Sequence, residues 1–385
     1  MIEWNDDQRK LRQAAQRLGA SLSEGYLDRD ARREFFSDGW KRAQATGLPA
    51  LPFDKRWGGL DQDLLTTMYV LEGLGHACRD GGLSFTLTTH MVSTGVPLQH
   101  FGSPALRERF LPGICAGGLI GAHAVSEPGA GSDMLAMRTS GRVDGDSLIL
   151  NGSKAFVSNG PIADVFVVYA RTDRASGPFG LSAVLVERDR PGLSLGNPMS
   201  KMGLRTSPLC ELFLDDCRVP TDNVIGGLGS GFLIFDHVMT WEVLCSFVVN
   251  VGEMQHRLER VVDYARTREQ FGRRIGSFQA VAHRVVNMRI AVDTARRALY
   301  DAAERFVRDG QATEDVAIAK LLTSEGNMST AVAAVETFGG SGYMSEIGLE
   351  HDVRDALGGL IYSGTSDIQR NRIAAMMGLN SPASG

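Results

Sequence analysis

The sequence predicts an α+β protein with a helical N-terminal domain, a small β domain and a helical C-terminal domain. Apolar residues recur at helical intervals as far as about residue 120, and short apolar runs separated by Gly, Pro, Asn and Asp follow. The helical interval returns after the glycine-rich GGLGSG at 226–231. Because 385 residues suffice for two or three compact cores, we expect domains at 1–120, 121–225 and 226–385.

The first domain is predicted to be helical throughout. Residues 8–27 and 64–78 place apolar side chains at helical spacing, and the loop LPFDKRWGGLD at 51–61 separates them. No convincing strand pattern interrupts these residues.

The middle domain is predicted to be a β structure because its apolar runs are short and bounded by turn residues. Alternating or continuous apolar runs of this length are typical of strands rather than helices. The predicted strands are LIGAHAV (119–125), DSLILNG (146–152), DVFVVYART (164–172), LSAVLVERD (181–189) and CELFLDDCRVP (210–220).

The C-terminal domain contains a long apolar stripe at alternating spacings of four and three residues. Such a stripe predicts one face of a long bundle helix, buried in the core or at a subunit interface. Its members are Val281, Val285, Met288, Val292, Ala295 and Leu299.

Composition excludes several classes of function. With 40 Lys and Arg against 45 Asp and Glu, the net charge of −5 gives no basic footprint for nucleic acid. The five cysteines are scattered and never in CxxC spacing, so we predict no disulfide framework and no metal site. The charged N-terminus lacks a signal-peptide pattern and no membrane span is predicted, which favours a cytoplasmic protein.

The segment GAHAVSEPGAGSD (121–133) carries the strongest local signal for chemistry. It passes from an apolar strand into a glycine-rich turn, whose exposed amides and small residues let a flat ring or a phosphate approach the backbone. Ser126 and Ser132 add hydroxyl donors. A generic glycine-rich loop could be a plain turn, so the context of this one decides its meaning.

This loop resembles the SEPGAGSD motif of the acyl-CoA dehydrogenases. Four further segments resemble that family in the expected order: KAFVSNG (154–160), KMGLRTS (201–207), YARTREQFGRRIGSFQ (264–279) and ETFGGSGY (336–343), followed by IYSGTSDIQR (361–370) at the end of the chain. The resemblance implies a helical N-domain, a β-barrel-like middle domain and a C-terminal four-helix bundle. It also implies FAD as cofactor and a homotetramer.

The same resemblance assigns the FAD contacts. The family pattern places strand residues along the flavin and lets Arg268 and Gln279 reach the cofactor of a neighbouring subunit, whereas Glu336 stands where Gln is more usual. The residues expected to bind FAD are His123, Val125, Ser126, Gly131, Ser132, Phe156, Ser158, Arg268, Phe271, Gln279, Glu336, Gly339, Gly340, Thr365, Ser366 and Asp367.

The general base of the family is missing from its commonest place, because Ser363 stands where a Glu is usual. A neutral Ser cannot remove a proton on its own. A minority branch that resembles isovaleryl-CoA and long-chain acyl-CoA dehydrogenases carries the Glu on the first long helix of the C-domain, and that position is Glu242 here. The apolar flank in MTWEVLCSF predicts a raised pKa for Glu242, as a base requires, although an ordinary surface Glu is the alternative.

Ser363 keeps two expected roles. Its small side chain makes room for Glu242 or substrate, and its amide polarises the thioester carbonyl, as the backbone does at that position in the family. The thioester itself is expected to contact Ser132, Trp241, Tyr362 and Gly364, and segment 85–100 is expected to form part of the acyl pocket floor.

The residues beside Glu242 point to the carrier of the substrate. Most CoA-dependent members have an Asp and an Arg where this chain has Thr240 and Val243, so a charge-assisted CoA anchor is absent. Together with MTWE and Ser363, this resembles the enzymes of secondary metabolism that oxidise acyl or aminoacyl groups on an acyl or peptidyl carrier protein, above all prolyl-carrier-protein dehydrogenases. An ordinary short- or branched-chain acyl-CoA dehydrogenase and a non-catalytic flavin-binding scaffold are the alternatives. An electron-transfer flavoprotein and oxygen are both open as electron acceptors.

Overall fold

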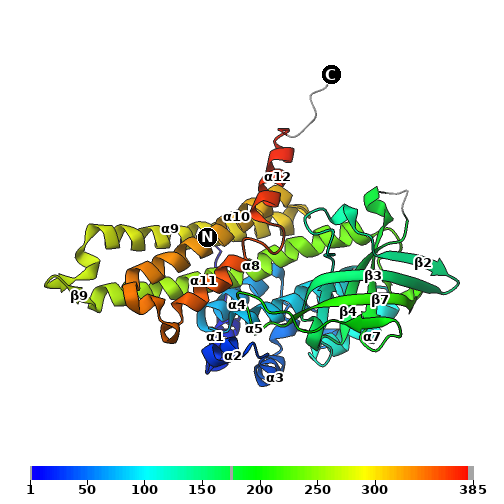
Figure 1. Cartoon of the computed structure of the whole chain (residues 1–385), viewed down its shortest axis with the longest axis horizontal. Coiled ribbons are helices and arrows are strands. Elements are labelled where there is room, and N and C mark those ends of the chain that lie inside the picture. Colours follow the sequence, from blue (N-terminus) through cyan, green and yellow to red (C-terminus); the bar gives the residue numbers. More distant parts are fainter. Residues whose placement is uncertain (1, 174–176, 380–385) are drawn as a thin grey trace.

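The computed structural model describes residues 2–173 and 177–379 and shows helices, then a mixed sheet, then helices again along the chain (Figure 1). The fold is α+β, as the sequence predicts, and within the described residues before 121 there is no strand. The helices of this first part are α1 (Asp6–Leu22), α2 (Tyr26–Arg32), α3 (Ser37–Ala45), α4 (Leu64–Ala77), α5 (Gly81–His90), the π-helical turn η3 (Met91–Gly95), α6 (Val96–Phe101) and α7 (Pro104–Cys115).

The helix starts and stops follow local chemistry. Asn5 forms a capping box with Gln8 at the start of α1, and Asp63 caps α4 by accepting from the amide of Thr66. The helical spacing predicted over 8–27 is divided between α1 and α2, because the chain turns at Gly25, which has a φ of 67°. That left-handed conformation suits glycine and ends a helix.

The middle of the chain forms one mixed sheet with strand order β6-β7-β3-β2-β4-β5-β8, and β1 pairs in parallel with β4. The predicted strand regions are all present, but β2, β6 and β8 were not predicted because they are short or polar. The strands are β1 (Gly121–Ala124), β2 (Ser140–Asp144), β3 (Ser147–Ser158), β4 (Val165–Arg171), β5 (Leu181–Glu187), β6 (Leu193–Leu195), β7 (Leu209–Pro220) and β8 (Val224–Ile225).

The C-terminal part is a helical bundle with a small hairpin at its far end (Figure 1). The predicted stripe on α9 is correct, since Met288, Val292, Ala295 and Leu299 are buried. The elements are α8 (Gly231–Thr267), the hairpin strands β9 (Glu269–Gln270) and β10 (Arg273–Arg274), then α9 (Gln279–Asp309), α10 (Thr313–Phe338), α11 (Leu349–Gly358) and α12 (Ser366–Met376).

Helix α8 is the central helix of the molecule. By length and mean hydropathy (1.6 over its most apolar 18-residue window) it could cross a membrane, but 61% of that window is buried inside the protein, as in a core helix. It packs very closely on α4: a Cβ added to Gly75 would lie 2.1 Å from the carbonyl oxygen of Val249, and one on Gly252 would lie 2.2 Å from that of Glu72. These glycines therefore fix how closely α4 approaches the helix that carries Glu242.

A buried ion-pair cluster joins all three parts of the chain. The His351 Nε2 of α11 lies 3.7 Å from Asp30 Oδ1 of α2 and 3.4 Å from Asp355 Oδ2, and Asp355 Oδ1 accepts from the amide of Leu204 at 2.6 Å. Burial alone would lower the pKa of His351, but the surrounding carboxylates raise it to about 9. A protonated imidazole between two carboxylates accounts for this cluster without a metal ion. The five cysteines are all buried and free.

Candidate active site

Glu242 lies on the first half of α8, where it faces hydroxyl groups from two distant segments. Its Oε1 accepts a hydrogen bond from Ser363 Oγ at 2.5 Å, and its Oε2 accepts one from Ser93 Oγ at 3.3 Å. Burial raises the pKa of Glu242, while the hydrogen bonds from Ser363 and Ser93 act against that rise. The direction of the shift is the one predicted from its apolar flank.

Ser363 lies in the loop between α11 and α12, in an uncommon backbone conformation. Its φ is 55°, and Gly364 follows with a φ of 83°. A non-glycine residue in the left-handed region costs about 1–3 kcal/mol and persists only when its surroundings hold it there. Here the Gln369 Nε2 donates to the Ser363 carbonyl at 2.9 Å. Within residues 2–173 and 177–379, the Ser363 amide has no acceptor, as expected of a group available to a substrate carbonyl.

Ser93, which was not singled out in the sequence, reaches Glu242 from the π-helical turn η3. It lies within 85–100, where only a contribution to the pocket floor was predicted. A π turn is rare and often marks a functional site. The turn is tied to the sheet by His90, whose Nδ1 accepts from the Gly121 amide at 3.0 Å and whose Nε2 donates to the Ile114 carbonyl at 3.1 Å. The hydrogen bond from the Gly121 amide to His90 therefore fixes the start of η3 against β1.

Tyr362, the residue before Ser363, packs among aromatic rings. Tyr362 packs against Phe85 and Phe247, with ring centroids 5.0 Å and 5.2 Å away. Its hydroxyl donates to Asn250 Oδ1 at 3.3 Å. Tyr362 was predicted to touch substrate, and it lies next to Ser363 with its ring held in place from three sides.

Trp241, which was predicted to contact the substrate, lies on a different side of α8 from Glu242. It is only 7% exposed, and its ring packs with those of His100 and His237, 5.9 Å and 6.4 Å away. One residue along a helix is a rotation of about 100°. Trp241 therefore points away from the face that carries Glu242, although the two residues are adjacent.

The predicted flavin-facing residues lie on β1 and β3 or directly after β1. Phe156 has a φ of 57° at a register shift of β3 and is 61% exposed, an arrangement that presents an aromatic ring to a ligand. Among the residues that the structure describes, the buried His123 Nε2 has no hydrogen-bond partner, and the His123 ring packs on that of Tyr169 with centroids 5.2 Å apart. Val125, Ser126 and Ser158 are partly accessible.

The glycine-rich loop and the start of α12 also have room for a ligand. A Cβ added at Gly131 would meet no atom within 4 Å, and Ser132 is exposed beside it. Thr365 caps α12 by accepting from the Ile368 amide at 3.2 Å, and the buried Ser366 Oγ has no hydrogen-bond partner in the described part of the chain. Asp367 is exposed. Open glycine backbone, an exposed ring and unpaired buried polar atoms fit a flat aromatic cofactor with a phosphate group.

The other predicted FAD contacts lie at the opposite end of the bundle (Figure 1). Arg268 follows the last turn of α8, 26 residues beyond Glu242, which is roughly 39 Å along a helix. Phe271, 93% exposed, and Gln279 lie in the same hairpin region. Tyr264 stacks on Phe338 at 3.9 Å, which brings the end of α10 to this region too. Gly339 and Gly340, which follow Phe338, are exposed there.

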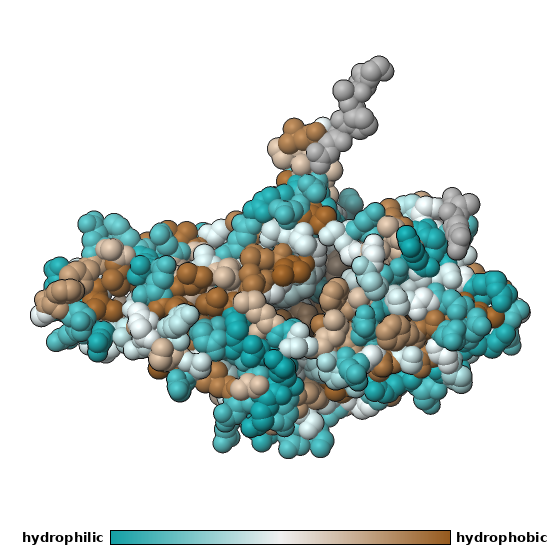
Figure 2. Space-filling model, in the orientation of Figure 1, coloured by the Kyte–Doolittle hydropathy of each residue, from teal (hydrophilic) through white to brown (hydrophobic). Residues whose placement is uncertain are grey.

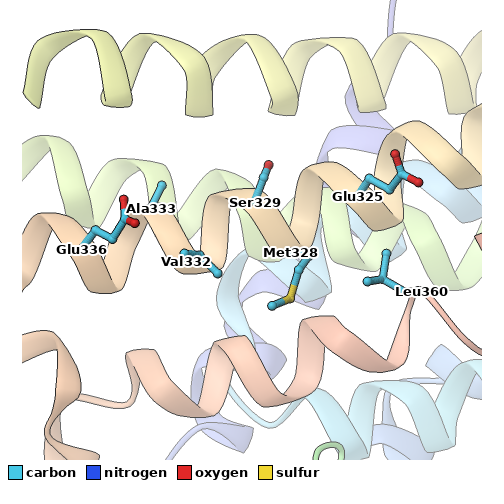
Figure 3. A pocket seen from close by; sticks show the side chains of 7 residues that line it. All are labelled: Glu325, Met328, Ser329, Val332, Ala333, Glu336 and Leu360. Atoms are coloured by element: carbon cyan, nitrogen blue, oxygen red, sulfur yellow. The ribbon is translucent and has the colours of Figure 1, made fainter. Parts of the chain in front are cut away.

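Glu336, which was predicted to contact FAD, forms an ion pair within the chain. Its Oε2 lies 3.1 Å from Arg284 Nε of α9. It also lines a shallow pocket of about 420 Å³ on the outer side of α10 (Figure 3), together with Glu325, Met328, Ser329, Val332, Ala333 and Leu360. The single chain thus brings Glu242 together with Ser93 and Ser363, and Ser363 lies three residues before the start of α12, whereas the hairpin residues lie beyond the far end of α8.

Family models match the chain in three consecutive segments. They are the N-terminal domain of acyl-CoA dehydrogenase over residues 5–118, the middle domain over 122–217 and the C-terminal domain over 229–378.

Individual relatives match over most of the chain. An L-prolyl-(peptidyl-carrier protein) dehydrogenase of Serratia sp. is 38% identical, with 90% of this chain and 89% of that protein covered. A cyclohex-1-ene-1-carbonyl-CoA dehydrogenase of Geobacter metallireducens is 40% identical, with 84% of each covered. A solved structure of PigA with FAD and proline superposes with a TM-score of 0.96 at 35% identity, over 98% of this chain and 99% of that one.

Proposed function

The chain belongs to the acyl-CoA dehydrogenase family, and from this premise we propose that it oxidises a thioester carried on the phosphopantetheine arm of a carrier protein. The acyl or aminoacyl group would be desaturated between its α and β carbons, with FAD as cofactor and Glu242 as general base. The observation that carries the proposal is the Glu242 carboxylate beside Ser363, because it puts a base next to the position where the common base is missing.

FAD fits the residues that this chain presents. Phe156 and Ser158 would lie along the flavin ring, and the turn at Gly131 and the start of α12 at Ser366 would receive polar groups. When bound, FAD supplies the acceptor for the hydride that leaves the β carbon.

Glu242 would take the proton from the α carbon. The bond from that carbon to hydrogen breaks, its electron pair forms the new double bond, and the hydride leaves the β carbon, so the product is an α,β-unsaturated thioester. Glu242 ends the step as a neutral carboxylic acid, which burial favours over the carboxylate. The Ser363 amide would donate to the thioester carbonyl and stabilise the negative charge that develops there.

The surroundings of Glu242 favour a carrier protein over CoA. Val243 is 3% exposed, and the Thr240 hydroxyl donates to the Asp236 carbonyl of its own helix at 3.1 Å. Neither side chain can supply the charged contact that Asp and Arg give at these positions in most CoA-dependent members. A substrate held through a protein partner does not need that contact.

A second candidate is an ordinary acyl-CoA dehydrogenase that binds CoA through other residues. The 40% identity to a CoA-dependent relative favours it. Turnover of the same acyl group on the two carriers separates the candidates: L-prolyl and butyryl groups, each on a peptidyl carrier protein and on CoA. We expect efficient turnover of a carrier-bound group and little of its CoA ester. Efficient turnover of the CoA ester would contradict the carrier proposal.

The exposed residues at the hairpin end suggest that several copies of the chain assemble. Arg268, Phe271 and Gln279 are exposed and far from Glu242, so they would serve the FAD of a neighbouring subunit in a homotetramer. Figure 2 shows apolar patches along the helical half of the surface, as subunit contact would require. The electron acceptor would be an electron-transfer flavoprotein or oxygen. Mixing the anaerobically reduced holoenzyme with each acceptor separately, and measuring the rate of reoxidation, distinguishes them.

A further inference from the structure

The carboxylate of Glu242 is held from both sides by neutral hydroxyl donors. Ser363 donates to Oε1 from the loop before α12, and Ser93 donates to Oε2 from the π turn before α6. We propose that Ser93 and Ser363 are positioning residues that fix the Glu242 carboxylate for proton abstraction, an inference that rests on the proposed role of Glu242 as base.

Both donors occupy backbone conformations that need support from elsewhere. Ser93 lies in a π-helical turn, and Ser363 has a φ of 55°. Ordinary helical geometry would give η3 a different register, so the extra residue of the π turn determines which side chain faces α8. Because both unusual conformations place a hydroxyl at the same carboxylate, we infer that both serve to hold it.

Tight packing holds the π turn in this register. A Cβ added to Gly95 would lie 2.1 Å from Phe53 Cζ, so this glycine lets the turn sit directly on the Phe53 ring. Thr94 Oγ1 donates to the Ala122 carbonyl of β1 at 3.4 Å. Ser93 is 1% exposed and has little freedom to leave Glu242.

No cation is needed to hold the carboxylate. Within 2–173 and 177–379, the titratable groups that face Glu242 are Tyr169 of β4 and Tyr362, and burial raises the pKa of each hydroxyl so that both remain neutral. Ser363 and Ser93 are the groups whose hydrogen bonds favour the ionised form against burial. The hydroxyls thus favour the ionised form of Glu242 without adding a charge beside the substrate.

The arrangement also leaves the base free to act. A carboxylate oxygen has two lone pairs, and each serine occupies one lone pair of one oxygen. The proton from the α carbon can therefore bind a free lone pair while the carboxylate plane stays fixed. This distinguishes the serine pair from a salt bridge, which would oppose protonation strongly.

The variants Ser93→Ala and Ser363→Gly remove one hydroxyl each, and glycine accepts the positive φ at 363 without strain. The holoenzyme can be titrated by infrared difference spectroscopy, where the Glu242 carboxyl band is identified by its absence in Glu242→Gln. We expect the pKa of Glu242 to rise by about one unit for each hydroxyl removed. Ser84→Ala, at a buried serine of α5, is the matched control and should leave the band unmoved.

The same variants should shift the acid limb of flavin reduction in single turnover with an L-prolyl-loaded peptidyl carrier protein. Rates should fall about tenfold at pH values below the native pKa and recover at pH values well above the new one, because the base must be ionised to act. An unchanged carboxyl pKa in both single variants, with FAD content retained, overturns the inference. Flavin reduction by Glu242→Gln at the native rate would instead overturn the proposed function, so the two failures are distinct.

Discussion

At its amino-terminal end α8 carries Glu242 into a closed setting of hydroxyls and aromatic rings, whereas at its carboxyl-terminal end it delivers Arg268 and Phe271 into solvent (Figure 1). The Glu242 carboxylate at the first end accepts hydrogen bonds from two serines of the same chain. The residues of the second end that were predicted to bind FAD lie far from Glu242 along the helix.

This difference indicates which parts of the site one chain can supply. The base and its supports come from α8, η3 and the loop at Ser363, all packed in one core. The hairpin residues require a second copy to become part of a site. We therefore expect changes at the first end to alter chemistry and changes at the second to alter cofactor binding and assembly.

The largest effect is expected at Glu242. Glu242→Gln keeps the shape but removes the base, so flavin reduction by substrate should slow by about 10²–10⁴-fold, the usual contribution of general base catalysis. FAD content should remain normal. Anaerobic stopped-flow measurement of flavin bleaching gives the rate, and Glu259→Gln on an exposed part of the same helix is the control. An unchanged rate would show that Glu242 is not the base, whereas no flavin reduction by substrate in the native protein would support a non-catalytic flavin-binding scaffold.

The next effect concerns Glu253, which lies between the two ends of α8. Burial raises its pKa to about 7, against the opposing hydrogen bond from Asn250 and the charge of Arg257. A raised pKa means that the folded state binds this proton more tightly, so its contribution is present below about pH 4.5 and is lost as pH rises through 7.

Glu253→Gln should remove that dependence. The free energy of unfolding of the native protein should fall by at most about 3 kcal/mol between pH 4.5 and 8 through this group, and the variant should not show that component. Urea unfolding at several pH values measures it. A variant with the same pH dependence as the native protein would show that Glu253 is ionised throughout.

A smaller effect is expected at the hairpin end. Arg268→Ala removes a charge-assisted contact to FAD, so affinity for the cofactor should fall about 10–100-fold, while flavin reduction in fully loaded enzyme should be nearly normal. Arg266→Ala, two residues earlier, is the matched control. FAD release during dialysis measures the effect.

A mixed assembly of Arg268→Ala and Glu242→Gln subunits sharpens this comparison. If Arg268 contacts the FAD of a neighbouring subunit, some sites in the mixed assembly combine an intact Glu242 with an intact Arg268. We expect activity above that of either variant alone. Activity no greater than that of Arg268→Ala would place Arg268 outside the neighbour's site.

The smallest effect on the single chain is expected for Phe271→Ser. This ring is 93% exposed, so the substitution should change the free energy of unfolding by less than about 0.5 kcal/mol. Assembly should weaken instead, as sedimentation at decreasing concentration would detect. A large loss of stability with unchanged assembly would contradict the proposed subunit contact.

Much of this architecture could be predicted from periodicity and resemblance. The α9 stripe, the strand regions and the proximity of positions 242 and 363 follow from local pattern and motif order. Short polar strands such as β2 could not be predicted, because Ser140–Asp144 owes its strand form to pairing with β3 rather than to its own composition.

Ser93 was missed for a different reason. A π turn adds one residue to a helical pattern without a characteristic residue type, so the sequence gives no sign of which side chain will face α8. Trp241 illustrates the converse: it is adjacent to Glu242 in sequence but packs with His100 and His237 on another side of the helix. Direction around a helix, rather than proximity along it, decides which residues meet.

A structure with FAD and an unreactive substrate thioester bound is the most direct test of Glu242 as the base. We expect a Glu242 carboxylate oxygen within about 3–3.5 Å of the α carbon, on the side of the substrate opposite the flavin, with Ser93 and Ser363 still in contact. A Glu242 carboxylate turned away from the thioester, with another base at the α carbon, would contradict it.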